Sequence, residues 1–200
     1  MVKKVLTDIH RYWFGELKLP TDIVARDRID MWFRPTEEVD RHIGDTFGKY
    51  LEAAKMTEWD VDNLSRTEQV GLVLLLDQFP RHIFRTSGDA FAYDAKALSI
   101  ARRLVAGGFE RFYPVERTFV ALPFEHSEDL ADQDYSTLLF AAEAVAAPLQ
   151  AKDGLRAALD FATKHRDIIR KFGRFPHRNV ALGRESTPEE IEFLKGGRGF

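Results

Sequence analysis

The first group of residues that could do chemistry follows a strongly apolar stretch near the middle of the chain. Asp77, Arg81 and Arg85 are spaced four residues apart, and Gln78 lies beside the first of them. On a helix this spacing places an acid and two guanidinium groups on one face. Two arginine forks close together suit a carboxylate or a phosphate group. The alternative is structural: Asp77 and Arg81 pair with each other, and Pro80 can break the helix between the two arginines.

The second group is an acidic run that begins beside His126. Five acids fall between Glu125 and Asp134, with no Lys or Arg among them. His126 with Glu128 or Asp129 could supply an acid–base pair or metal ligands. The alternative is that the acids gather at a helix start because the helix dipole favours negative charge there. No H-E-x-x-H or comparable ligand spacing is present, so we expect no metal site.

The third group is basic. Residues 164–184 contain seven Lys or Arg and one acid, Asp167, which gives a local charge of +6 with the histidines neutral. Its candidate ligand-binding residues are Arg174, His177, Arg178, Asn179 and Arg184. One interpretation is internal, with the basic run lying against the acidic run of residues 125–134. The other is that the loop binds an anion from outside the chain.

The element that must position the first group is a central helix. Ser65 and Glu68 have the spacing of a capping box, which predicts a helix start. Residues 70–76 are apolar on nearly every side, and a helix of this kind belongs in the middle of a protein. We therefore expect this helix to be the most deeply buried and to present residues 77–85 at its end.

Helical periodicity continues through the rest of the chain, and no segment has the alternation of a half-buried strand. The other predicted helices cover residues 3–16, 23–33, 36–54, 89–105, 114–121, 127–147, 155–172 and 187–195. The predicted N-caps include Thr36, Ser127 and Thr187. These patterns predict an all-α protein of about eight helices and a single domain, residues 1–200, with residues 196–200 as a loose tail.

Composition excludes several classes. The chain has 200 residues, a hydrophobic fraction of 44%, a net charge of −3 and no cysteine. A nucleic-acid binder would usually be basic overall, and without cysteine there are no disulfides or thiolate sites. The longest apolar run is too short to cross a bilayer, and no signal-peptide pattern opens the sequence. We expect a cytoplasmic protein that contacts neither nucleic acid nor membrane.

Several separated motifs resemble one bacterial family, the domain-of-unknown-function family numbered 924. They are DQFPR at 77–81, AFAYD at 90–94, LPFEHSEDLADQ at 122–133, GRFPHRN at 173–179, YWFG at 12–15 and LGREST at 182–187. His82 stands where the family pattern usually has Asn. The resemblance implies an all-helical fold similar to tetratricopeptide-repeat superhelices, a solenoid-like antiparallel stack without easily recognised repeats. It implies no activity.

Two hypotheses about function follow from these groups. The first is a binding module that takes a peptide segment of a protein partner, or a small anionic ligand, on one concave face where the polar motifs converge. The second is an enzyme acting on a small carboxylate or phosphate substrate, with acid–base groups drawn from Asp77, His126, Glu128 and His177. Arg81, Arg174 and Arg178 would hold the anion. We expect no cofactor, and the absence of a recognised catalytic spacing favours the binding module.

Overall fold

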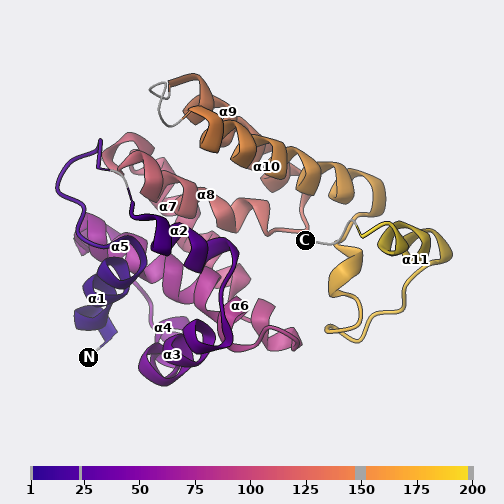
Figure 1. Ribbon diagram of the computed structural model, residues 1–200, viewed down its shortest axis with the longest axis horizontal. Helices are drawn as coiled ribbons and strands as arrows, with labels where there is room; N and C mark the ends of the chain where they lie inside the picture. The colour runs from indigo at the N-terminus through magenta and orange to yellow at the C-terminus, as the bar shows by residue number, and fades with distance from the viewer. Residues whose placement is uncertain (1, 23, 147–151, 198–200) are drawn as a thin grey trace. The chain divides into compact units, whose positions relative to one another are not determined.

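The computed structural model describes residues 2–22, 24–146 and 152–197, and in these residues the chain forms helices and no strand. The all-α prediction is confirmed for this part of the chain (Figure 1). The α-helices are α1 (Val2–Phe14), α2 (Arg26–Phe33), α3 (Glu37–Phe47), α4 (Leu51–Met56), α5 (Arg66–Val73), α6 (Phe79–Ile83), α7 (Asp94–Ala106), α8 (Pro114–Glu125), α9 (Leu130–Ala146), α10 (Lys152–Phe172) and α11 (Pro188–Lys195). Two predicted helices are each interrupted once, which is why the labels run to α11.

The chain divides into two compact units, each described below by itself. The first comprises the described residues of Met1–Arg85 and Asp89–Pro123, and the second those of Thr86–Gly88 and Phe124–Phe200. The short segment Thr86–Gly88 belongs to the second unit because Gly88 lies against Ala181, where a Cβ would come within 2.6 Å of the carbonyl oxygen. The prediction of a single domain over residues 1–200 stays a prediction.

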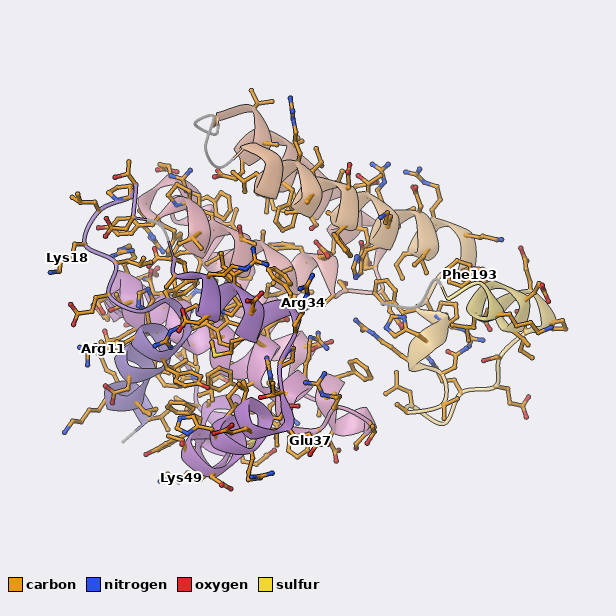
Figure 2. The ribbon with its side chains drawn as sticks, viewed as in Figure 1. Arg11, Lys18, Arg34, Glu37, Lys49 and Phe193 are labelled. Atoms are coloured by element: carbon orange, nitrogen blue, oxygen red, sulfur yellow. The ribbon has the colours of Figure 1, made fainter. Side chains whose placement is uncertain are left out.

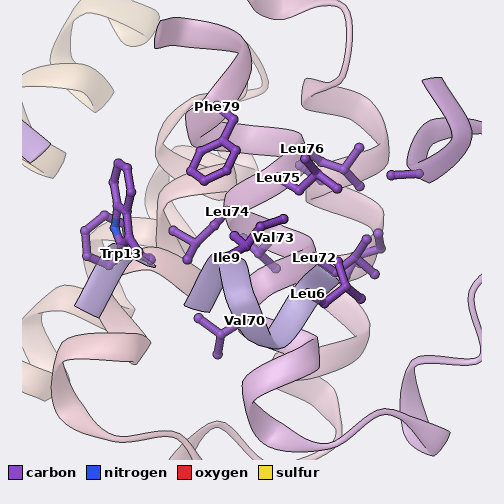
Figure 3. Close-up of a cluster of buried hydrophobic side chains, with 14 of the residues drawn as sticks. Leu6, Ile9, Trp13, Val70, Leu72, Val73, Leu74, Leu75, Leu76 and Phe79 are labelled. Atoms are coloured by element: carbon purple, nitrogen blue, oxygen red, sulfur yellow. The ribbon is translucent and has the colours of Figure 1, made fainter. Parts of the chain in front are cut away.

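The core of the first unit is built around α5 and the residues that follow it (Figure 3). The capping box predicted at Ser65 and Glu68 is present. The apolar side chains of Val70 and of residues 72–76 are all 0% exposed. They pack against Leu6, Ile9 and Trp13 of α1 and against Phe79 of α6. This confirms that the central helix is deeply buried.

The helix does not break at Pro80. Instead, Leu74–Gln78 forms a π-helical segment, closed by a hydrogen bond from the amide of Phe79 to the carbonyl oxygen of Leu74. Proline has no N–H to donate, and its ring collides with the carbonyl four residues earlier in a regular α-helix. The wider π turn removes that conflict, and α6 continues across Pro80.

Helix α1 crosses α5 at Gly71. A Cβ at this position would collide with the carbonyl oxygen of Leu6. Only glycine permits so close an approach of the two backbones. The single glycine inside the apolar run therefore has a packing role that its sequence position does not reveal.

The predicted helix over residues 36–54 is interrupted near its middle. Thr36 caps α3 by accepting from the amide of Val39, as expected. The chain then passes through a 3₁₀ turn, Gly48–Tyr50, before α4 begins. Ile43, Phe47, Leu51 and Ala54 remain buried throughout, so the amphipathic pattern survives the change of helix type.

The second unit contains α9 and α10, which pack side by side and run in opposite directions (Figure 1). Helix α9 begins at Leu130, later than predicted, because Asp129 accepts from the amide of Ala131. Ser127 instead bonds to Asp132 and to the amide of Asp129. The segment 147–151, where the predicted end of α9 falls, lies outside the described residues.

The end of the chain folds back on α10. Gly173 ends α10 with a φ of +69°, a conformation that suits glycine. Thr187 and Glu190 form the predicted capping box of α11. Phe193 of α11, which is labelled in Figure 2, packs on Phe172 with the ring centroids 5.0 Å apart. Of the predicted tail, residues 198–200 lie outside the described residues. Among the described helices, none has the length and hydropathy needed to cross a membrane.

Candidate functional site

The first predicted group lies in the first unit, where its charges are engaged with one another. Asp77 is 0% exposed, and Nε2 of Gln78 donates to its Oδ2 at 2.6 Å. Nη2 of Arg81 lies 3.7 Å from Oδ1 of Asp77 and donates to Oδ1 of Asp94 at 2.9 Å. The structural interpretation of the Asp77–Arg81 pair is therefore supported, with Asp94 as a second carboxylate on the same guanidinium.

Arg85 and His82 share a different carboxylate, that of Asp40 on α3. Nη2 of Arg85 donates to Asp40 at 2.6 Å, and Nδ1 of His82 lies 2.8 Å from Oδ1 of the same side chain. Burial lowers the pKa of His82 despite the hydrogen bond to Asp40, which raises it. The residue that departs from the family pattern thus joins α6 to α3.

The first unit also holds a buried ionic network around Glu116. Oε1 of this 0% exposed glutamate lies 2.6 Å from Nε2 of His10. Its Oε2 accepts from Arg66 and from the amide of Tyr113, 2.7 Å away. These contacts tie α1, α5 and α8 together. The sequence analysis missed them because the partners are 106 and 50 residues apart along the chain.

In the second unit the acidic run and the basic run lie side by side, as predicted. Glu128 accepts two hydrogen bonds from Arg184, at 2.7 and 3.0 Å, and one from the amide of Phe175 at 2.8 Å. Burial opposes ionisation of Glu128, but the bonds from Arg184 and Phe175 hold its pKa below the usual value. Internal neutralisation is thus confirmed for Glu128 and Arg184.

A second pairing fixes the loop after α10. Arg174 donates to both oxygens of Glu190, at 2.7 and 2.8 Å. The hydrogen bonds from Arg174 are the main reason that the pKa of Glu190 is lowered to about 2. Asn179 donates to Ser186 at 3.0 Å and accepts from Arg184 at 2.9 Å. Arg174, Asn179 and Arg184 therefore hold the loop in shape.

The ring of Phe175 is contacted by side chains from α10 and from the loop after it. We call His126, His165, His177 and Arg178 the histidine–arginine cluster. The guanidinium of Arg178 lies 4.4 Å above the Phe175 ring, and the rings of His165 and His177 are 5.5 and 5.6 Å from it. Nη1 of Arg178 donates to the carbonyl oxygen of His126 at 3.0 Å. His126 and His177 are half-buried, while Arg178 is buried.

One member of this cluster, His165, forms a buried pair with Glu125. Nδ1 of His165 is 3.1 Å from Oε1 of Glu125 and 2.9 Å from the carbonyl oxygen of Phe161. Burial, with smaller contributions from His126, Arg178 and His177, lowers the pKa of His165 to about 3, although the hydrogen bond to Phe161 raises it. His165 is therefore neutral, with Nδ1–H as the donor and Nε2 as an acceptor.

The predicted site residues thus fall into two sets. Asp77, Gln78, Arg81 and Arg85 lie in the first unit, and the second unit brings together His126, Glu128, Arg174, His177, Arg178, Asn179 and Arg184. The convergence of both sets on one face stays a prediction. Within the described ranges, no group of three or more His, Asp or Glu is placed to hold a metal ion.

Comparison with known proteins shows which family the chain resembles. A family model described as "Bacterial protein of unknown function (DUF924)" matches residues 9–198. The chain belongs to this family. It is also similar to a solved structure, a protein of unknown function, ATU0120, from Agrobacterium tumefaciens. That similarity has 32% sequence identity and a TM-score of 0.80, and it covers 98% of this chain and 99% of the other. A comparison with curated proteins finds no match.

In this DUF924 protein, the residues that sequence reasoning missed are Glu125 and His165. Glu125 appeared only as one acid of a run, and His165 only as a neutral residue in a basic helix. His165 does have a detectable signal, since Ala162, His165 and Ile169 recur at helical spacing on the buried face of α10. A histidine on such a face needs a buried partner, which only the structure identifies.

Proposed function

We propose that this protein is a binding module for an anionic group, a carboxylate or a phosphate, and that the histidine–arginine cluster is its binding site. The ligand class is a small anion or an acidic peptide segment. The observation that carries the proposal is the packing of the buried Arg178 and the half-buried His177 against the Phe175 ring, with Arg178 also donating to the carbonyl oxygen of the half-buried His126.

The charges around the cluster support this proposal. Glu128 and Glu190 are engaged by Arg184 and Arg174, so these pairs neutralise each other. Burial is the main cause of the lowered pKa of His165, and the neighbouring His126, Arg178 and His177 act in the same direction. An arginine fork matches the oxygens of a carboxylate or phosphate, and protonated histidines add charge below about pH 6.5.

The alternative is an enzyme acting on a small carboxylate or phosphate substrate. The observation that favours it is the buried Glu125–His165 pair, because a carboxylate on one ring nitrogen orients a histidine for acid–base work. Steady turnover of a bound anion, abolished in His165→Gln, would favour the enzyme. Binding without turnover would favour the module.

The proposal also keeps two expectations from the sequence. A tetratricopeptide-like, solenoid-like stacking of helices would give a binding module a concave face, and a cytoplasmic location would expose it to phosphorylated metabolites and acidic peptides. Both belong to the proposal and rest on the family resemblance and on composition.

The test is a binding titration with inorganic phosphate, citrate and an acidic peptide, followed by calorimetry at pH 6 and pH 8. We expect one of these classes to bind, and more tightly at pH 6 than at pH 8, because a protonated imidazole attracts an anion. His177→Gln should weaken binding about tenfold, as loss of one charged hydrogen bond does.

The matched control is Arg170→Gln, which removes a half-exposed charge from α10 in the same unit. It should leave the affinity unchanged. If all three ligands bind equally weakly in wild type, His177→Gln and Arg170→Gln, the effect is general screening by salt and the proposal is wrong.

A further inference from the structure

Helix α9 carries two buried polar atoms without a hydrogen-bond partner among the described residues. They are Oε1 of Gln133 and Oγ of Ser136. Both residues are 0% exposed, so bulk water does not reach either atom. Buried polar groups in native proteins are almost always hydrogen-bonded, which makes an adjacent pair of such atoms informative.

The orientation of Gln133 is fixed by its amide nitrogen. Nε2 donates to the carbonyl oxygens of Glu125 and Ser127, each at 2.6 Å. A flipped amide would place Oε1 against these two carbonyl oxygens, which cannot donate. Oε1 therefore points away from residues 125–127 and requires a donor.

Ser136 lies one turn further along the same helix. Residues three apart are neighbours on a helix surface, with Cβ atoms about 5–6 Å apart. One molecule making two ordinary hydrogen bonds, each about 2.8 Å long, spans such a gap. The hydroxyl of Ser136 can donate or accept, but Oε1 of Gln133 only accepts. The occupant must therefore be a small molecule that donates.

We propose that a water molecule is bound inside the second unit, donating to Oε1 of Gln133 and hydrogen-bonded to Oγ of Ser136. Buried waters of this kind satisfy otherwise unpaired side chains and are part of the fold. This water holds Gln133 in place, and Gln133 in turn fixes the carbonyl groups on either side of His126. The carbonyl of His126 itself accepts from Arg178. The inference does not depend on anion binding, since it rests on the buried contacts of Gln133 and Ser136.

The experiment compares wild type with Ser136→Ala and with the control Thr137→Ala. Thr137 is the neighbouring hydroxyl, and it donates to the backbone carbonyl oxygen of Gln133 at 2.9 Å. Oxygen-17 magnetic relaxation dispersion counts water molecules that stay bound for longer than the tumbling time. We expect Ser136→Ala to hold one long-lived water fewer than wild type and Thr137→Ala to hold the same number.

Thermal unfolding gives an independent readout. If the water is present, Ser136→Ala removes one of its hydrogen bonds and lowers the melting temperature. If Ser136 were truly without a partner, the substitution would remove an unsatisfied hydroxyl and raise the melting temperature. An unchanged water count in Ser136→Ala, or a raised melting temperature, overturns the proposal.

Discussion

At the scale of single residues, Glu128 has the most consequential set of contacts in the second unit. It joins the end of α8 and the loop after α10 through Arg184 and the amide of Phe175. It was predicted as an acid–base or ligand-binding residue. Its three hydrogen bonds hold the loop that carries His177 and Arg178, and its functional role stays a prediction.

We therefore predict that Glu128→Gln lowers the free energy of unfolding by about 1–3 kcal/mol, because bonds to a charged acceptor are lost. The control Glu185→Gln changes an exposed glutamate of the same loop and should cost less than about 0.5 kcal/mol. Urea unfolding measures both. Equal free energies of unfolding for the two variants would show that the Glu128 contacts do not stabilise the fold.

The buried His165 predicts a pH dependence. Its pKa in the folded protein is about 3, below the value of about 6.5 expected in the unfolded chain. As the pH falls below 6.5, the unfolded state binds a proton that the folded state does not, so stability is lost from about pH 6.5 towards pH 3.

The His165→Gln variant lacks the pH-dependent stability that His165 gives, so its free energy of unfolding should fall less steeply between pH 6.5 and pH 5. The control His42→Gln alters an exposed histidine and should keep the wild-type slope. Unfolding curves at several pH values measure the slopes. A His165→Gln slope identical to that of wild type would mean that His165 titrates normally.

At the scale of elements, the contact between α1 and α5 depends on Gly71. A methyl group there meets the backbone of Leu6, so Gly71→Ala must push the two helices apart. We predict a loss of about 1–3 kcal/mol, as overpacking of a core costs.

The matched control is Gly154→Ala on α10, where a Cβ meets nothing within 4 Å. Alanine is the better helix former by about 1 kcal/mol, so this variant should be stabilised. Thermal unfolding distinguishes the two glycines. If both substitutions stabilise the protein, the close contact between α1 and α5 at Gly71 is wrong.

The central helix gives a second prediction at this scale. Leu74 is 0% exposed in the π-helical segment, and Leu74→Ala should cost about 2–5 kcal/mol through the cavity that it leaves. Leu138→Ala removes the same atoms from a residue that is 62% exposed and should cost far less. A melting temperature unchanged by Leu74→Ala would contradict the assignment of the core.

At the scale of the whole molecule, the sequence predicted features that depend on nearby residues better than contacts between residues far apart in the chain. The all-α class, the capping boxes at Ser65 and Thr187 and the burial of the central helix follow from spacing within a few residues. The π turn before Pro80 could not be predicted from such spacing, because a proline in a helix can break it, kink it or be accommodated by a wider turn. The Glu116 network could not be predicted either, because its partners come from different helices.

The candidate site shows the same division. Opposite charge predicted that residues 125–134 and 164–184 lie together, and the structure confirms it. Charge alone could not predict which arginine pairs with which acid, because that depends on the path of the loop after Gly173. Arg174 and Arg184 are bound by acids, and Arg178 contacts Phe175 and the backbone of His126.

The central claim is that His126, His177 and Arg178 bind an anion. Imidazole proton–nitrogen NMR of the six histidines, titrated with inorganic phosphate or with citrate at constant ionic strength, tests it most directly. We expect saturable shifts of the His126 and His177 rings, with His42 in the first unit unchanged. Shifts of equal size in all six rings, or no shift with either anion, would contradict it.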